Sequence, residues 1–419
     1  MSIMKKILFN NDKNIKKQSI IWNLIASLLN AILSAYMLMI VIRFIGIREG
    51  GIFAIASTLA YQLLIIGNYG MRNFQATDVN DNYNFHEYLY SRYITSFLML
   101  LGTILLIIYN HYDISKSFII LSFILFKWID AIEDVYHGFY QKHNRLDVGC
   151  REQSYRYIAS LVVFTVVTII TKDLFISCMI TFIFSLIFFI VLNSYIKKFF
   201  MFDKCKKINK KRLCILLYEC FPLFISSYLY LYICNAPKYA IDSVLNDNIQ
   251  SYFGILFMPV FVINLISTLI YRPIITNMAE QWNNNKMSGF LKRVLKQISV
   301  IISLTIFAVV FAYFLGAKVL GTIYGMNIDK YKLELCLLMI GGGFNAFVSY
   351  MLTIITIIRK QKKVIFGYIG VSILSLLLSN VMVKNYSILG ASLLYLVLTI
   401  GLGFYFVIIF IIEYKKLKV

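Results

Sequence analysis

The chain has few charged residues and very little proline for its length. Of its 419 residues, 15% are charged, 60% are apolar or aromatic, and only 4 are proline. A soluble domain typically carries about 25% charged residues, because its whole surface faces water. The shortage of charge therefore excludes an ordinary soluble protein and predicts that most of the surface faces lipid.

Motifs of soluble enzymes and of metal sites are also missing. The seven cysteines include no C-x-x-C pair, the four histidines show no ligand spacing, and there is no G-x-S-x-G, H-E-x-x-H or Walker motif. The glycine run at 341–343 precedes no Lys-Ser or Lys-Thr, so it favours close helix packing over a phosphate-binding loop. These absences predict a protein that is not an enzyme and has no cofactor.

Apolar runs recur along the whole chain at the length that a membrane-spanning helix needs, which is about 20 residues. Twelve such runs lie at 18–42, 51–71, 93–110, 117–139, 155–171, 174–196, 213–235, 251–271, 297–316, 335–358, 364–383 and 388–412. The run at 117–139 carries the most charge. The loop that joins 155–171 to 174–196 is the shortest. The pattern predicts an all-α polytopic membrane protein of about twelve transmembrane helices, embedded in a lipid bilayer.

Positive charge is abundant, with a formal net charge of +21, but it is concentrated in the short gaps between these runs. If the N-terminus is placed in the cytoplasm, 31 of the 41 Lys and Arg residues fall in inner segments and 9 in outer loops. Inner loops of membrane proteins carry such an excess. The charge therefore predicts cytoplasmic N- and C-termini and no nucleic-acid partner.

The most basic loop, KKFFMFDKCKKINKKR at 197–212, separates the sixth run from the seventh. It predicts two six-helix lobes, an N-terminal one at 1–205 and a C-terminal one at 206–419. Parallel repeats of this kind are a common transporter plan.

Polar residues inside the first and fourth runs are the candidate functional residues, because polar groups are costly in hydrocarbon. Asn23, Ser27, Asn30 and Ser34 share one helix face, which fits either a water-filled pathway or a helix–helix seam. The fourth run carries a charged face made of Lys127, Asp130, Glu133, Asp134 and His137. We favour a cavity lining for this face over an internal salt-bridge network, and its acidic character allows coupling to a proton or sodium gradient.

Three basic residues at the ends of predicted helices are candidates for phosphate contact. Arg72 and Arg272 end the second and eighth runs on the cytoplasmic side, and Lys238 lies at the outer end of the seventh. Lys and Arg both bind phosphate oxygens, Arg in a bidentate manner. The alternative role is to anchor the helix ends at the membrane surface.

Four segments carry a family resemblance: MRNFQATDV with EYLYSR (71–92), EDVYHGFYQKHNRLDV (133–148), NAPKYAIDS (235–243) and FGILFMPVFVINLISTLIYRP (253–273). They resemble the bacterial polysaccharide repeat-unit flippases, the Wzx-type branch of the multidrug/oligosaccharidyl-lipid/polysaccharide exporter superfamily. The resemblance covers most of the chain up to about residue 280, and the rest matches in hydropathy only. After RLDV, where the family has a small residue and a lysine, this chain has Gly149, Cys150 and Arg151.

The resemblance implies two six-helix lobes around a central cavity in the bacterial cytoplasmic (inner) membrane. It implies transfer of an undecaprenyl-pyrophosphate-linked oligosaccharide to the outer leaflet, for O-antigen (lipopolysaccharide), capsule or another polymer, alongside other polysaccharide assembly proteins. The residues within the family's recurrent motifs are Arg72, Asp78, Arg92, Glu133, Asp134, Gly138, Arg145, Asp147, Asn235, Pro237, Lys238 and Asp242. Two alternatives are weighed against it: a cation-coupled drug or metabolite exporter of the same fold, which the acidic fourth run would suit, and a membrane-bound polymerase or ligase.

Overall fold

The structure is a computed structural model that describes residues 8–9, 14–78, 82–200, 209–284 and 286–416. These residues form helices and no strand. The chain divides into two compact units, residues 1–228 (unit 1) and residues 229–419 (unit 2). The predicted lobe boundary between residues 205 and 206 lies outside the described residues.

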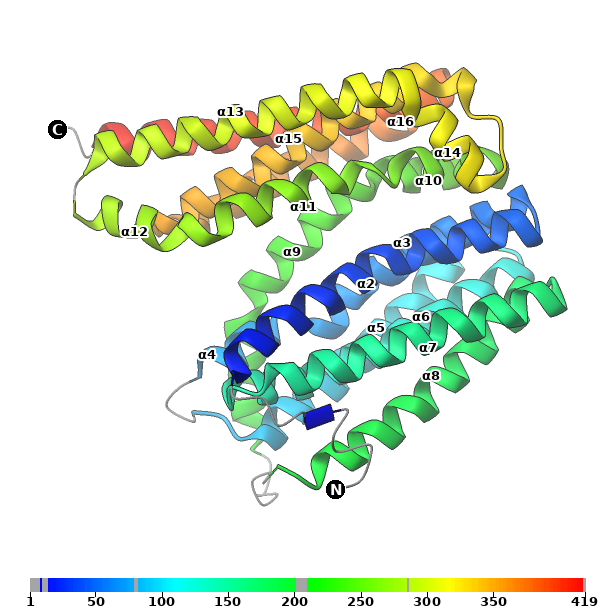
Figure 1. The fold of residues 1–419 in the computed structure, drawn as a ribbon, viewed down its shortest axis with the longest axis horizontal. Coiled ribbons are helices and arrows are strands. Elements are labelled where there is room, and N and C mark those ends of the chain that lie inside the picture. The colour runs from blue at the N-terminus through cyan, green and yellow to red at the C-terminus, as the bar shows by residue number, and fades with distance from the viewer. Residues whose placement is uncertain (1–7, 10–13, 79–81, 201–208, 285, 417–419) are drawn as a thin grey trace. The chain divides into compact units, whose positions relative to one another are not determined.

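Unit 1 is a bundle built around one buried helix, α3. Its helices are α2 (Ile15–Phe44), α3 (Ile47–Asn68), α4 (Met71–Thr77), α5 (Phe85–Tyr109), α6 (Ile114–Lys142), α7 (Leu146–Thr171), α8 (Leu174–Lys197) and the first part of α9 (Lys210–Val244). Figure 1 shows α2 to α8 as a layered group of long helices. Helix α3 contacts α2, α5 and α6, whereas the neighbouring helices expose many large apolar side chains. Exposed apolar faces of this kind are expected where lipid is the solvent.

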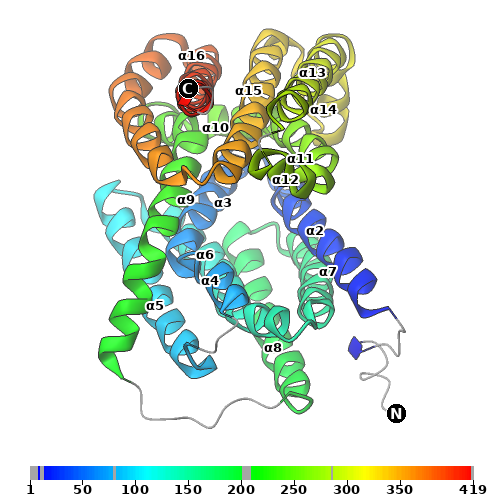
Figure 2. The same cartoon turned by 90° about the vertical axis from the view of Figure 1, so that its left-hand side faces the viewer.

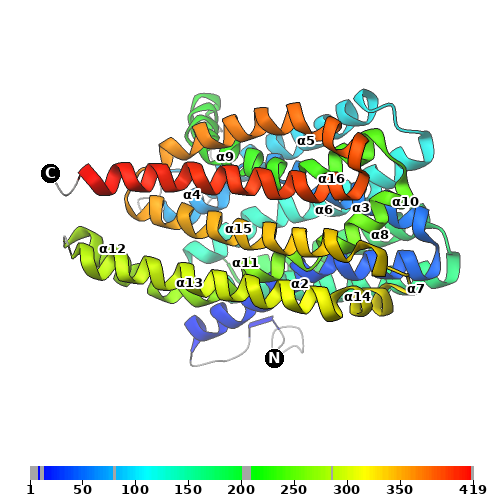
Figure 3. The ribbon, with the colours of Figure 1, turned by 90° about the horizontal axis from the view of Figure 1, so that it is seen from above.

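Unit 2 is built around α15. Its elements are the rest of α9, α10 (Asp247–Phe257), α11 (Val260–Tyr271), η1 (Arg272–Ile274), α12 (Ile275–Asn283), α13 (Met287–Phe311), the π-helix η2 (Ala312–Gly316), α14 (Ala317–Tyr324), η3 (Asp329–Tyr331), α15 (Lys332–Ile357), η4 (Gln361–Lys363) and α16 (Val364–Lys416). Helix α15 contacts α10, α11, α13 and α16, and Figure 3 shows α13, α15 and α16 running side by side.

Ten of the described helices are long and apolar enough to cross a membrane. The last of them, α16, is two helices joined at Ser387, whose φ of 52° and ψ of −129° are not helical. The two parts of α16 lie side by side in Figure 2. The Tyr405 hydroxyl of the second part donates to the carbonyl of Lys363, which directly precedes the first part. When α6, a 29-residue helix that is not among these ten, is added and α16 is counted as two, the described residues contain the predicted twelve helices.

The glycine run in α15 allows three neighbouring helices to approach closely. A Cβ atom added at Gly341 would lie 2.5 Å from Cδ1 of Tyr395 in α16, and one at Gly342 would lie 2.9 Å from the backbone oxygen of Val260 in α11. A Cβ at Gly343 would overlap the Thr305 side chain of α13. Small residues at membrane-helix contacts let backbones pack in this way. The predicted packing role of the run is confirmed.

Replacing Gly342 with alanine is expected to lower the free energy of unfolding by about 1–3 kcal/mol, because the new methyl group meets backbone rather than a movable side chain. Thermal unfolding of the purified chain in detergent measures the change. Gly370→Ala in α16 is the matched control, since an added Cβ there has nothing within 4 Å. Equal losses of stability in the two variants would contradict the packing role.

Candidate functional site

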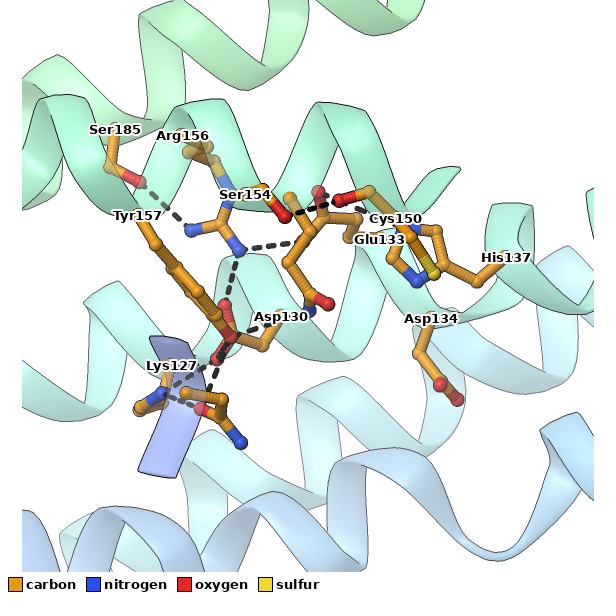
Figure 4. Close-up of polar contacts among 12 residues, drawn as sticks. Lys127, Asp130, Glu133, Asp134, His137, Cys150, Ser154, Arg156, Tyr157 and Ser185 are labelled. Atoms are coloured by element: carbon orange, nitrogen blue, oxygen red, sulfur yellow. Dashed lines mark hydrogen bonds and ion pairs between the residues drawn. The ribbon is translucent and has the colours of Figure 1, made fainter. Parts of the chain in front are cut away.

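The charged face of α6 points into unit 1, toward α2 and α7. Lys127 and Glu133 are 0% exposed, Asp130 is 6% exposed and His137 is 1% exposed. Figure 4 shows these side chains between α6 and α7. The sequence prediction that this face cannot meet lipid is confirmed.

Arg156 of α7 lies at the centre of the charged face. Its Nη2 is 2.5 Å from Asp130 Oδ1 and 2.6 Å from Glu133 Oε2, and its Nη1 donates to Ser185 Oγ of α8 at 3.0 Å. The guanidinium therefore ties α6, α7 and α8 together inside the unit. Sequence reasoning placed Arg156 among the inner-loop charges, because it predicted that the helix begins at 155. The helix begins at Leu146, so Arg156 lies more than two turns inside it.

Lys127 completes the network on the side of α2. Its Nζ is 2.8 Å from Asp130 Oδ2 and 3.1 Å from Asn30 Oδ1. The hydroxyl of Tyr157 donates to the same carboxylate oxygen of Asp130 at 2.9 Å, and the Lys127 Nζ lies 4.5 Å from the centre of the Tyr61 ring. Two cations and two anions (Lys127, Arg156, Asp130 and Glu133, here called the ion network) thus balance in charge.

The ion network matches the alternative that the sequence left open for the α6 face, an internal salt-bridge network. Each charged member finds its partner inside unit 1. Of the two asparagines of the first run, Asn30 joins this network, whereas half-buried Asn23 contacts the Cys150 thiol at 3.8 Å. Buried ion pairs of this kind specify how helices pack, and removing one partner leaves an uncompensated charge.

Asp134 differs from the other acidic residues of α6, because two arginines share its carboxylate. Arg92 of α5 is 0% exposed, and its Nη2 lies 2.7 Å from Asp134 Oδ2. Arg72 of α4 is 29% exposed, with its Nη1 at the longer distance of 3.5 Å from Asp134 Oδ1. Arg72 Nε also donates weakly to Gln141 at 3.4 Å. One carboxylate cannot neutralise two guanidiniums, so this group carries a surplus positive charge whose accessible part is Arg72.

The two basic candidates of unit 2 lie far apart. Lys238, in the last part of α9, is half-buried, with its Nζ 4.4 Å from the centre of the Phe257 ring. Arg272 is exposed and directly follows α11. Phe257, which Lys238 contacts, lies 15 residues before Arg272, which corresponds to roughly 22 Å of helix at 1.5 Å per residue. The structure therefore does not bring Lys238 and Arg272 to one point.

Several motif residues have structural partners. Arg145 donates to both oxygens of Asp147, at 3.0 and 3.1 Å. Gly138 gives room to the Gln75 side chain, which a Cβ would overlap. Asp78, just after α4, accepts from the backbone N–H groups of Asn82 and Tyr83 and from the Tyr88 hydroxyl. The remaining motif residues, Asn235, Pro237, Lys238 and Asp242, lie in the second half of α9.

Asp78 gives the turn between α4 and α5 a pH-dependent stability. Burial raises the pKa of its carboxyl, but the hydrogen bonds from Asn82, Tyr83 and Tyr88 outweigh burial and hold the pKa below its usual value. The stabilisation is complete above the unfolded pKa of about 3.9 and is lost as pH falls through the lower folded pKa.

Asp78→Asn is therefore expected to lower the free energy of unfolding by about 1–3 kcal/mol near neutral pH, the cost of lost charge-assisted hydrogen bonds. The difference in the free energy of unfolding between this variant and the unsubstituted chain should become smaller at acidic pH. Thermal unfolding measured from neutral to acidic pH tests this. A difference that stays constant with pH would show that the carboxylate charge plays no part.

Comparison with known proteins places this geometry in a family. Residues 17–279 match the family model described as polysaccharide biosynthesis protein. Among solved structures, the lipid II flippase MurJ in an inward closed conformation is 14% identical with a TM-score of 0.70, over 95% of this chain and 90% of that chain. A multidrug resistance MATE family transporter in an inward-facing conformation is 11% identical with a TM-score of 0.64, over 93% and 94%. A third structure is of a MOP superfamily transporter from Pyrococcus furiosus, which is described as having a binding pocket of reverse polarity. It is 11% identical with a TM-score of 0.55, over 100% of this chain and 98% of that chain.

No curated protein sequence matches the chain. The solved structures share their fold with this chain. The family model covers more than half of the residues. The chain is therefore a multi-pass membrane protein that belongs to the polysaccharide biosynthesis protein family.

Proposed function

We propose that this chain is a flippase for an undecaprenyl-pyrophosphate-linked oligosaccharide repeat unit. It moves the lipid-linked sugar from the inner to the outer leaflet of the bacterial cytoplasmic membrane by alternating access, with its N- and C-termini in the cytoplasm. Family membership supports a role in polysaccharide assembly. The MurJ neighbour is titled a lipid II flippase, and its shared fold is compatible with a lipid-linked substrate.

The observation that carries the proposal is the surplus charge at Arg72. Asp134 is held at 2.7 Å by buried Arg92, and the half-exposed Arg72 engages it only at 3.5 Å. A pyrophosphate is a stronger partner for Arg72 than Asp134 is, because it carries more negative charge and Asp134 is already engaged by Arg92. Arg72 is therefore the proposed first contact for the pyrophosphate, and Arg272 and Lys238 are proposed contacts elsewhere on its path.

The ion network has a supporting part in this proposal. The ion network fixes α6 to α7 within unit 1, and Asp134 of the same helix pairs with Arg72 and Arg92. A binding residue that lies on a helix is held in position more precisely than one that lies on a loop. Of the sequence candidates, Asn23 and Asn30 act in the same supporting way through α2.

The drug-exporter alternative needs acidic groups that can receive a cationic substrate. Asp130, Glu133 and Asp134 each already have a Lys or Arg partner within 3.5 Å. A cationic drug would have to displace those partners. Resistance to organic cations when the chain is overproduced would nevertheless favour the exporter over the flippase.

Deletion of the gene in its own host tests the proposal. Complete lipid-linked repeat units are expected to accumulate on the inner leaflet, and surface polymer is expected to be lost. Labelling of the lipid-linked glycans from each side of the membrane measures both. Normal surface polymer without inner-leaflet accumulation would contradict the flippase role. Restoration by the intact gene is the control.

A further inference from the structure

Four buried polar side-chain atoms gather between α6 and α7, next to the ion network. They are Glu133 Oε1, His137 Nε2 and both carboxylate oxygens of Glu152, and none has a hydrogen-bond partner in the described part of the chain. Ligand atoms of the three side chains all lie within 4.8 Å of one another. All three residues are at most 1% exposed. Buried polar atoms are rarely left unpaired, so this group calls for an explanation.

The orientation of His137 brings its Nε2 close to the Glu133 carboxylate. The imidazole lies against Gly149, and its Nε2 is 3.9 Å from Glu133 Oε1. The absence of a side chain at Gly149 permits this position, because a Cβ there would lie 2.6 Å from Cδ2 of the ring. Two lone pairs that face each other repel unless a positive charge or a hydrogen atom stands between them.

The charges of Glu133, His137, Glu152 and the ion network indicate which kind of cation these three residues would bind. The ion network is neutral, so an ionised Glu152 adds a negative charge that has no hydrogen-bond partner among the described residues, at a site with 0% exposure. One positive charge restores neutrality, whereas a divalent metal would leave an excess. Sodium is a hard cation that prefers oxygen ligands, while an imidazole nitrogen accepts a proton readily.

Several other charged or titratable groups surround the cluster and act on it. They are Arg72 of α4, Asp130, Asp134, Tyr136 and Tyr140 of α6, Cys150, Arg156 and Tyr157 of α7, and Lys197 of α8. Arg156 is the nearest cation, but its Nη2 is already engaged by Asp130 and Glu133. Lys197 lies over the Tyr136 ring, with its Nζ 4.4 Å from the centre. The described surroundings therefore supply no donor to Glu152.

We propose that Glu133, His137 and Glu152 form a proton-binding site in unit 1, and that the proton it carries is the coupling ion for transport. The Glu152 carboxyl carries the proton and donates a hydrogen bond to Glu133 or His137. The site itself follows from the geometry alone, whereas its coupling role rests on the proposed flippase function. Because Glu133 also binds Arg156, release of the proton from Glu152 places a negative charge beside the ion network and changes the force that joins α6 to α7.

Infrared spectroscopy of the purified full-length chain, with its glutamates labelled with ¹³C, tests the site. The spectrum at neutral pH should contain the carbonyl band of a protonated glutamate, which Glu152→Gln removes. Glu280→Gln is the matched control, because Glu280 is exposed in α12, and it should leave the band unchanged. The absence of the band from the unsubstituted chain would overturn the proposal even if Glu152→Gln failed to fold. Persistence of the band in folded Glu152→Gln would overturn it too.

Radioactive sodium and manganese(II) are the competing probes. Binding of either ion to the unsubstituted chain, with loss of binding in Glu152→Gln, would replace the proton site by a metal-ion site and overturn the proposal. The coupling role is tested separately in liposomes, where an imposed pH gradient should raise the transport rate of the unsubstituted chain and not that of Glu152→Gln. An equal response of both would overturn the coupling role. A protonated Glu152 in a chain that moves no lipid-linked sugar would contradict the flippase and leave the site intact.

Discussion

Arg156→Met is expected to lower the free energy of unfolding by about 3–5 kcal/mol, the typical cost of breaking a buried ion pair from one side. The side chain is 0% exposed and contacts Asp130 at 2.5 Å and Glu133 at 2.6 Å. Methionine fills a similar volume but leaves Glu133 without its cation and Asp130 with Lys127 alone. Thermal unfolding in detergent and the amount of chain in the membrane measure the loss.

Two further variants separate this effect from the general cost of removing an arginine. Arg48→Met, at an exposed position of α3, should change stability by less than about 1 kcal/mol. In the double variant Arg156→Met and Glu133→Gln, the remaining buried charges, Lys127 and Asp130, pair with each other, and much of the lost stability should return. If Arg156→Met unfolds at the temperature of the unsubstituted chain, the ion network does not hold the unit together.

Arg72→Ala is expected to slow transport roughly 10- to 100-fold at limiting substrate, with little change in stability. A charge-assisted hydrogen bond contributes about 1.5–3 kcal/mol, and each 1.4 kcal/mol is a factor of about ten. Stability should change little because Arg72 is 29% exposed and its ion pair with Asp134 is long, at 3.5 Å. The initial rate of movement of a lipid-linked oligosaccharide across liposome membranes measures the effect.

Arg72→Lys and Arg48→Ala are the matched variants for this experiment. Lysine keeps the charge but loses the bidentate geometry, so its rate should lie between those of arginine and alanine. Arg48→Ala removes an exposed arginine from the start of α3 and should leave the rate unchanged. If Arg72→Ala, Arg272→Ala and Lys238→Ala all transport normally at normal protein levels, the basic-contact part of the proposal is wrong.

The helices could be predicted from the sequence because lipid imposes a simple rule. A run of about 20 apolar residues crosses the bilayer, and its backbone must be satisfied within the helix. Even the charged run at 117–139 forms a helix, α6, because its charged residues lie on one face that the interior of unit 1 can pair. The division of α16 into two helices was also predictable, because the runs at 364–383 and 388–412 are separated by a gap.

The partners of the charged face could not be predicted in the same way. Helical periodicity shows which side chains share a face, but not which neighbouring helix meets that face. Lys127 contacts Asn30, which lies 97 residues earlier in the chain, and Arg156 contacts Asp130 from 26 residues later. Placing the start of α7 at 155 hid both Arg156 and Glu152. A helix predicted from 146 would have placed Glu152 and Arg156 one turn apart on a single face, four residues apart.

Reconstitution of the purified chain into liposomes tests the central claim most directly. The liposomes contain an undecaprenyl-pyrophosphate-linked oligosaccharide on both leaflets, and a membrane-impermeant glycan-cleaving enzyme is added outside. The flippase account predicts that the inner-leaflet oligosaccharide also becomes accessible over time, and that Arg72→Ala slows this step. Cleavage that stops at the outer-leaflet fraction, with folded and correctly inserted chain present, would contradict the account.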